Sequence, residues 1–122
     1  MKVLIVEKER DFLYSLERLL KKRGYEISTA FDGVQGTEEM LSDNFDAIVF
    51  GEQIPRISAE EIIAKAKENG KTSAFVLMRK NKNELAETRN DNGCFDVVVN
   101  LPFTPADLYG HIEDVVNLKN VK

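Results

Sequence analysis

The sequence has one cysteine, one histidine, no tryptophan and no long run of apolar residues. The single thiol, Cys94, cannot form an internal disulfide, and Cys94 with His111 cannot build a four-ligand zinc site without carboxylates. No apolar stretch approaches the roughly 20 residues of a membrane span, and the first residues run into a strand pattern rather than a signal peptide. We therefore expect a reduced, cytoplasmic protein with no metal, disulfide or membrane contact.

The chain also lacks a run of basic residues, since 17 Lys and Arg stand against 21 Asp and Glu, a formal net charge of -4. This balance argues against nonspecific nucleic-acid binding and against adsorption to an anionic membrane. The 122 residues are 43% hydrophobic and 31% charged. A chain of this length buries roughly two thirds of its unfolded surface, so it needs no disulfide or metal to hold it. We predict one domain over residues 1–122, with about 2–118 structured.

Short apolar runs are the main strand signal in the sequence. Such runs are typical of strands covered on both faces, as in a parallel sheet between layers of helices. They are Val3–Val6, Ala47–Phe50, Phe75–Met78 and Val97–Val99. Residues 25–30 instead alternate polar and apolar side chains, which predicts a strand at an edge of the sheet.

Helical patterns lie between these runs. Asp32 is expected to cap the second helix, Ser58 and Glu61 form a capping box for the third, and the last begins at Thr104 with Pro105 at its first position. Residues 82–92 contain three Asn and few apolar side chains, so we predict a short, weakly docked helix there. The apolar stripes of the first two helices are Phe12, Leu13, Leu16, Leu19 and Leu20, ending before Gly24, and then Val34, Thr37, Met40 and Leu41.

The strand–helix order repeats five times along the chain, which predicts a doubly wound α/β fold. Five units of this size fit a flavodoxin-like (βα)5 sheet of five parallel strands in the order 2-1-3-4-5. Ligands of such sheets bind beyond the carboxyl ends of the strands. The candidate functional residues are therefore those that follow Val6, Phe50, Met78 and Val99.

Three stretches of sequence, VLIVEKE, AIVFGEQIP and VVVNLPFTPADL, resemble the signature regions of the receiver domain of two-component response regulators, the CheY-like family. The likeness runs from Lys2 to about Leu118. It implies a site in which two acids after the first strand hold Mg²⁺ and an Asp at the end of the third strand accepts a phosphoryl group from a histidine kinase. A Thr or Ser after the fourth strand and a Lys after the fifth then bind that group.

This chain departs from the family at most of these positions. Gly51 stands at the acceptor position, four residues before Pro55. The other matched residues are Glu7 and Lys8 at the two acids, Glu52 after the acceptor position, Arg79 (or Lys80) at the hydroxyl position, and Asn100 or Leu101 at the Lys position. We therefore predict a pseudo-receiver that is no enzyme, signals by protein–protein contact without Asp phosphorylation, and holds Mg²⁺ weakly or not at all.

Lys8 and Arg79 leave two alternatives open. In one, they pair with Glu7 and Glu52 and lock the pocket in a single state. In the other, a pocket that is basic at its centre holds a phosphate-bearing small molecule or another anion beside Gly51. A conventional phosphorylated receiver is a third reading, against which Gly51 counts heavily. Gly51 itself marks either a lost acceptor or a turn that needs a positive φ.

The resemblance also implies that partners contact the face formed by the predicted helix at 82–92, the last strand and the last helix. Phe95, Phe103 and Tyr109 flank this face and are our candidate partner surface. The partners expected are proteins, and a homodimer is left open. We expect Cys94 to fill space in the core and His111 to be a partly exposed helix residue.

Overall fold

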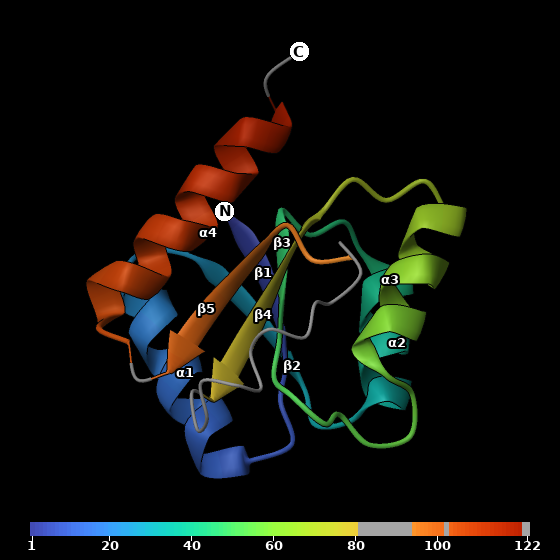
Figure 1. The fold of residues 1–122 in the computed structure, drawn as a ribbon, viewed down its shortest axis with the longest axis horizontal. Helices are drawn as coiled ribbons and strands as arrows, with labels where there is room; N and C mark the ends of the chain where they lie inside the picture. The colour runs from blue at the N-terminus through green and yellow to red at the C-terminus, as the bar shows by residue number, and fades with distance from the viewer. Residues whose placement is uncertain (81–93, 102, 121–122) are drawn as a thin grey trace, which may run out of the picture.

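Five parallel strands form one sheet in the order β2-β1-β3-β4-β5. Figure 1 shows this sheet in a computed structural model, which describes residues 1–80, 94–101 and 103–120. The strands are β1 (Lys2–Val6), β2 (Glu26–Ala30), β3 (Ala47–Phe50), β4 (Ala74–Lys80) and β5 (Val97–Leu101). The predicted sheet and strand order are confirmed, and the strand that we placed at an edge is β2.

Four helices lie among the described residues: α1 (Arg10–Lys22), α2 (Gly33–Ser42), α3 (Ala59–Glu68) and α4 (Pro105–Asn120). Helices α1 and α4 cover one face of the sheet, and α2 and α3 cover the other (Figure 1). The helix predicted at residues 82–92 lies outside the described residues. None of the helices among the described residues combines the length and the hydropathy that a membrane-spanning helix needs.

The core divides into two clusters, one on each face of the sheet. In β1, Val3 and Ile5 face the α1/α4 side, whereas Leu4 and Val6 face the α2/α3 side. All four are fully buried, because successive side chains of a strand point to opposite faces and both faces are covered here. This double burial explains why the central strands appear in the sequence as unbroken apolar runs.

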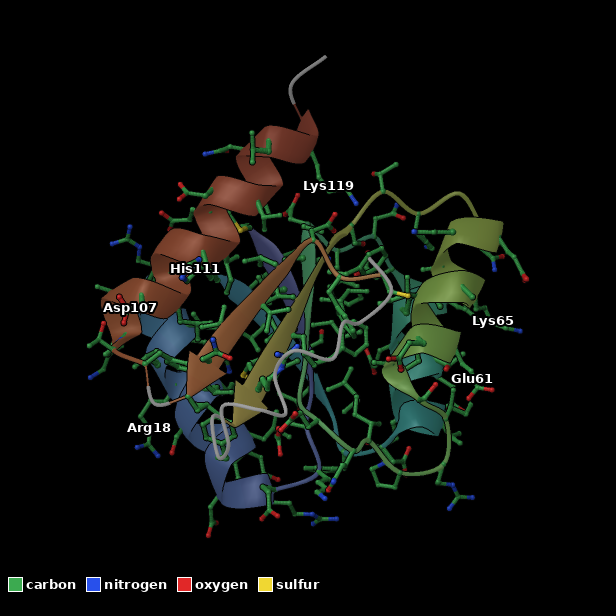
Figure 2. The ribbon with its side chains drawn as sticks, in the orientation of Figure 1. Arg18, Glu61, Lys65, Asp107, His111 and Lys119 are labelled. Carbon is green, nitrogen blue, oxygen red and sulfur yellow. The ribbon has the colours of Figure 1, made fainter. Side chains whose placement is uncertain are left out.

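The predicted helix starts are confirmed. Gln35 N donates to Asp32 Oδ1 at 2.9 Å, which caps α2. In the capping box of α3, Glu61 N donates to Ser58 Oγ and Ser58 N donates to Glu61 Oε1, each at 3.1 Å. Figure 2 shows Glu61 in the first turn of α3 and Asp107 in the first turn of α4. Asp107 N donates to Thr104 Oγ1 at 3.1 Å, so Thr104 caps α4 and Pro105 is its first residue, as predicted.

The apolar stripe predicted for α2 is wrong in two of its members. Val34 is 36% exposed and Leu41 is 44% exposed, whereas Gly33, Gly36 and Met40 are buried. The reason is the close approach of this helix to its surroundings: a methyl group on Gly36 would lie 3.1 Å from a Val6 methyl carbon. Small residues face the sheet where a helix packs this closely, so apolar spacing alone mispredicted the buried face.

The last two strands extend further than their apolar runs suggested. Arg79 pairs with Asn100, and Lys80 pairs with Leu101, inside the β4–β5 ladder. These four residues, which we expected beyond the strand ends, are therefore held in the sheet itself. Their backbone positions are fixed by the parallel pairing rather than by a loop.

Candidate functional site

The candidate site lies at the carboxyl end of β1 and β3, which are neighbours in the sheet. Val6 is paired with Phe50, so the next residues, Glu7 and Gly51, lie side by side. Gly51 N donates to Val6 O at 2.9 Å, and Glu7 N donates to Ala30 O at 3.0 Å. The backbones of both residues are therefore extensions of the sheet, with fixed positions.

The side chain of Glu7 lies over Gly51. The Glu7 residue is only 5% exposed, and its Oε2 accepts a hydrogen bond from Glu9 N at 2.9 Å. A methyl group built on Gly51 would lie 2.9 Å from Glu7 Cδ and closer still to Oε1. The carboxylate of Glu7 thus occupies the space that a side chain at position 51 would need.

A positive φ does not explain Gly51. The described glycines with positive φ are Gly24 and Gly70, and the loop after β3 instead places Gln53 (φ 56°) and Arg56 (φ 77°) in the left-handed region. The explanation of Gly51 by a turn that needs a positive φ is therefore wrong. The notable feature at Gly51 is instead the close approach of the Glu7 side chain. The left-handed residues fall two and five positions further along the loop.

Lys8 connects two loops of the site. Its ammonium donates to Gln53 Oε1 at 3.3 Å, which joins the segment after β1 to the segment after β3. Arg79 is half-buried on β4 and Glu52 is exposed, and both make interactions of their own. The pairing of Lys8 and Arg79 with Glu7 and Glu52 stays a prediction.

A cavity of about 500 Å³ opens at this edge of the sheet. Its described lining includes four carboxylates and one ammonium, that of Lys8, over apolar side chains. The lining residues are Glu7, Lys8, Glu9, Asp11, Phe12, Glu52, Gln53, Met78 and Leu101. Among the described lining residues the start of α1 adds Glu9 and Asp11, and Arg79 is not one of them, so the basic centre predicted from Lys8 and Arg79 stays a prediction. The described part of this lining offers an anion more carboxylates than cationic groups.

The residues present do not fit the Mg²⁺ ion that the resemblance implies. The Glu7 carboxylate is turned toward Glu9 N and Gly51, and Lys8 stands at the position of the second acid. Within the described ranges, no group of three or more His, Cys, Asp and Glu side chains is placed to hold a metal ion. Mg²⁺ requires oxygen ligands in an octahedral array, and the described side chains do not supply one.

The three aromatic residues predicted as one partner surface are not brought together. Phe95 packs against the cluster under α2 and α3, with its ring centroid 6.0 Å from that of Phe50. Phe103 and Tyr109 pack on the opposite side, against the cluster under α1 and α4. All three are half-buried and contribute to packing, and their role as a partner surface stays a prediction.

Tyr109 belongs to a polar cluster that our sequence reasoning missed, at the junction of α4 with the α1–β2 turn. Its hydroxyl donates to Leu19 O at 3.2 Å, and its ring stands edge-on to Tyr25. Arg23 Nε and Nη2 each donate to Glu113 at 3.1 Å, and the Tyr25 hydroxyl donates to the same carboxylate. The four-residue spacing of Tyr109 and Glu113 on one helix face could have indicated it.

The electrostatics of this cluster follow from its contacts. The hydrogen bond from Arg23, followed by that from Tyr25, lowers the pKa of Glu113. Burial, followed by the hydrogen bond to Glu113, raises the pKa of the Tyr25 hydroxyl. The cluster therefore favours an ionised Glu113 and a neutral Tyr25.

His111 and Cys94 lie as the sequence indicated. His111 is exposed on α4, where Figure 2 labels it. Cys94 is half-buried and packs against the α2/α3 cluster.

Comparisons with known proteins agree with this fold. The family model described as "Response regulator receiver domain" matches residues 3–113. "Response regulator ArlR" of Staphylococcus haemolyticus is 26% identical over 129 residues, which cover 98% of this chain and 58% of that protein. The ArlR protein of Staphylococcus saprophyticus is 29% identical over 111 residues, covering 91% of this chain and 50% of that protein. The chain thus spans about half the length of these curated relatives.

Solved structures show the same architecture. A response regulator receiver domain protein from Clostridium thermocellum superposes with a TM-score of 0.80 at 21% identity, over 97% of this chain and 95% of that chain. TrrA from Thermotoga maritima, solved in complex with Mg²⁺-BeF, gives 0.79 at 22% identity, over 93% of this chain and 97% of that chain. The family match covers most of the chain, and the fold and strand order agree with it. This chain belongs to the response regulator receiver domain family.

Proposed function

We propose that this receiver domain acts in two-component signalling through protein–protein contact, without phosphorylation at the family's acceptor position and without catalysing a reaction of its own. The observation that carries the proposal is the pair Glu7 and Gly51. The acceptor position has no side chain, and the carboxylate of its neighbour lies in the vacated space. Phosphoryl transfer needs a nucleophilic oxygen aligned with the donor, and Gly51 has none to offer.

Neither neighbouring carboxylate is well suited to replace the missing acceptor. Glu7 is 5% exposed and accepts a hydrogen bond from Glu9 N, so a donor has little access to it. Glu52 is exposed, but it lies one residue beyond the acceptor position, in the loop after β3. In-line attack tolerates displacements of only about 1 Å without a large loss of rate.

The partners that we propose are proteins. The relatives that the chain matches are named response regulators and are about twice its length, so the matched part is a receiver that operates beside another segment in those proteins. In the present chain, the input to such a partner would not depend on an acyl phosphate at residue 51.

Incubation with acetyl phosphate and Mg²⁺, followed by intact mass spectrometry, tests the proposal. We expect no gain of the mass of one phosphoryl group. A receiver that keeps its acceptor Asp, treated in parallel, shows that the donor is active. A stoichiometric gain of one phosphoryl group would contradict the proposal, and the variants Glu7→Gln and Glu52→Gln would then show which carboxylate had accepted it.

A further inference from the structure

We infer that the loop after β3, residues 51–57, is a strained strap across the candidate site, and that the start of α2 holds it there with Gly33 as its positioning residue. This loop, which we call the strap, carries Glu52 and Gln53 to the cavity. How the strap is held is a separate question from whether residue 51 accepts a phosphoryl group, so the inference goes beyond the proposed function.

Two residues of the strap have a strained backbone. Arg56 has a φ of 77°, and Ile57 N donates to Pro55 O at 3.0 Å across it. A three-residue turn closed in this way around a positive φ is a γ-turn of the rare, strained kind. Gln53 has a φ of 56°, also in the left-handed region, where the β carbon crowds the following carbonyl oxygen. Both side chains are exposed, so their burial does not offset the strain, and other contacts must hold the strap in this conformation.

The start of α2 supplies such contacts. Gly33, the first residue of α2, donates its N–H to Pro55 O at 2.9 Å, so this oxygen accepts one hydrogen bond across the turn and one from the helix. The first N–H groups of a helix have no acceptor within it, and the strap satisfies one of them here. Ile54 and Ile57 of the strap pack against the α2/α3 cluster. Figure 1 shows the loop from β3 to α3 passing this helix start at the carboxyl end of the sheet.

Gly33 and the strap approach each other through main-chain atoms. A methyl group on Gly33 would lie 2.6 Å from Ile57 C and closer still to Ile57 O. A side chain could turn aside from such a contact, but the main chain gives way only if the strap itself moves. The described glycines with positive φ are Gly24 and Gly70, so the close approach, and not the backbone conformation, requires a glycine at residue 33. We therefore expect any side chain at residue 33 to push the strap away from α2.

The strap connects this contact to the cavity. Gln53 Oε1 accepts a hydrogen bond from Lys8 Nζ at 3.3 Å, and Gln53 and Glu52 both line the cavity. Gly33 is not among the described lining residues. A strap that moved away from α2 would carry Gln53 with it and disturb its hydrogen bond with Lys8. Gly33 thus acts on the site through the strap.

A double-mutant cycle on thermal unfolding tests whether α2 imposes the strain. The chains compared are the wild type, Arg56→Gly, Gly33→Ala and the double variant. We expect Arg56→Gly to raise the Tm of the wild type by about 2–4 °C, because glycine adopts a positive φ without the steric cost, although it gains more entropy on unfolding. Gly33→Ala by itself is expected to lower Tm by about 5–10 °C. In that background the strap is displaced, so Arg56→Gly is expected to leave Tm unchanged or to lower it.

Two variants serve as matched controls. Thr72→Gly changes an exposed loop residue that is not among those with positive φ, so it is expected to lower Tm. Gly110→Ala adds a methyl group that meets nothing within 4 Å, so it is expected to leave Tm unchanged or to raise it. An equal rise in Tm on Arg56→Gly in both backgrounds would overturn the inference, and so would the absence of a rise in the wild type.

The side-chain amide of Gln53 reports on the positioning role of Gly33. Its NMR resonances are expected to shift in Gly33→Ala, because the hydrogen bond from Lys8 is disturbed, and to stay in place in Gly110→Ala. A loss of stability by itself does not move these resonances while the chain is folded. If Gly33→Ala moved them no further than Gly110→Ala does, Gly33 would not position the strap.

Hydrogen exchange of the wild type decides the question if Gly33→Ala does not fold. Gly33 N donates to the strap, whereas Gly36 N donates to Asp32 O at the start of the same helix, also at 2.9 Å. If the strap stays on α2, the amide of Gly33 is expected to exchange within about tenfold of the rate of Gly36. Faster exchange of the Gly33 amide than this would overturn the inference.

The two proposals can fail separately. A phosphoryl group gained by the wild type would contradict the proposed function and leave the coupling of Gly33 with Arg56 unchanged. An additive cycle would overturn the strained strap and leave the absence of an acceptor side chain at Gly51 as it is.

Discussion

Glu113 is the residue through which α4 is tied to the turn between α1 and β2. Its carboxylate accepts two hydrogen bonds from Arg23 and one from the Tyr25 hydroxyl. The Arg23 guanidinium also lies 4.8 Å from the Tyr109 ring centroid. The carboxylate and the aromatic ring both hold the planar guanidinium in place, so this ion pair forms with a smaller loss of side-chain entropy than an isolated surface pair. We therefore expect it to contribute more to the free energy of unfolding than a typical exposed ion pair.

Replacement of this carboxylate by Glu113→Gln should reduce the free energy of unfolding by on the order of 1 kcal/mol near neutral pH. Because the contacts lower the pKa of Glu113 from its ordinary 4.5, the stabilisation is present above that pH and is lost as the pH falls through the folded-state value. Urea unfolding of both chains should therefore show a difference that is largest near neutral pH and shrinks as the pH falls below about 4.5.

Glu17→Gln is the matched control for Glu113→Gln, because Glu17 pairs with Lys21 along the surface of α1 at 3.1 Å. This exposed i, i+4 pair is expected to contribute about 0.2–0.5 kcal/mol. If Glu113→Gln lowered the free energy of unfolding no more than Glu17→Gln does, Glu113 would not tie α4 to the turn between α1 and β2. An effect of Glu113→Gln that stayed the same in acid would also contradict this role.

At the level of elements, the starts of the helices could be predicted from local sequence, whereas their buried faces could not always be. The starts of α2, α3 and α4 could be predicted, because a capping side chain and the N–H that it accepts from lie within three residues. The buried face of α2 could not, because it depends on how closely Gly36 approaches Val6 on another element. The contacts of Tyr109 could not be predicted for the same reason, because Leu19 and Tyr25 lie far from it in the sequence.

Tyr109 is therefore expected to act on the docking of α4 rather than on partner binding alone. Tyr109→Ala should lower the free energy of unfolding by about 2 kcal/mol, because the ring is half-buried against the α1/α4 cluster. Tyr109→Phe, which keeps the ring and loses the hydrogen bond to Leu19 O, should cost about 1 kcal/mol. Both values can be measured by urea unfolding.

Tyr14→Ala serves as the comparison for Tyr109→Ala. Tyr14 is 45% exposed on α1 and makes an edge-on contact with Phe31, so its loss is expected to cost below about 1 kcal/mol. If Tyr109→Ala cost no more than Tyr14→Ala, the packing role would be wrong and the surface role predicted from the sequence would regain support.

At the scale of the whole molecule, the fold and the location of the site were both predictable, whereas the state of the site was not. Strand order and the crevice between β1 and β3 follow from the alternation of apolar runs and helices. The charge of the cavity depends on Glu9 and Asp11, which only the packing of α1 brings to the carboxyl edge of the sheet. The position of the Glu7 carboxylate beside Gly51 depends on the direction of one side chain, which no spacing in the sequence encodes.

The acidic cavity gives a prediction about Mg²⁺. Despite its carboxylates, the wild type should show a change in Tm below about 1 °C on addition of about 10 mM MgCl₂, relative to NaCl of equal ionic strength. The reason is that the Glu7 carboxylate is turned to Glu9 N and Gly51, and that the Lys8 ammonium stands beside Gln53 at the cavity. A cation bound with a Kd of about 1 mM would instead stabilise the fold by about 1.4 kcal/mol, a shift of several degrees.

Lys8→Asp and Lys8→Ala separate the charge of Lys8 from the presence of an acid at this position. Lys8→Asp removes an ammonium and adds a carboxylate to a lining that already holds four, so it should gain a Mg²⁺-dependent rise in Tm of about 3 °C or more. Lys8→Ala only removes the ammonium and should respond less. If the wild type responded to Mg²⁺ as strongly as Lys8→Asp does, Lys8 would not be what keeps the metal out. An ammonium at the second acid position would then be compatible with a bound divalent cation.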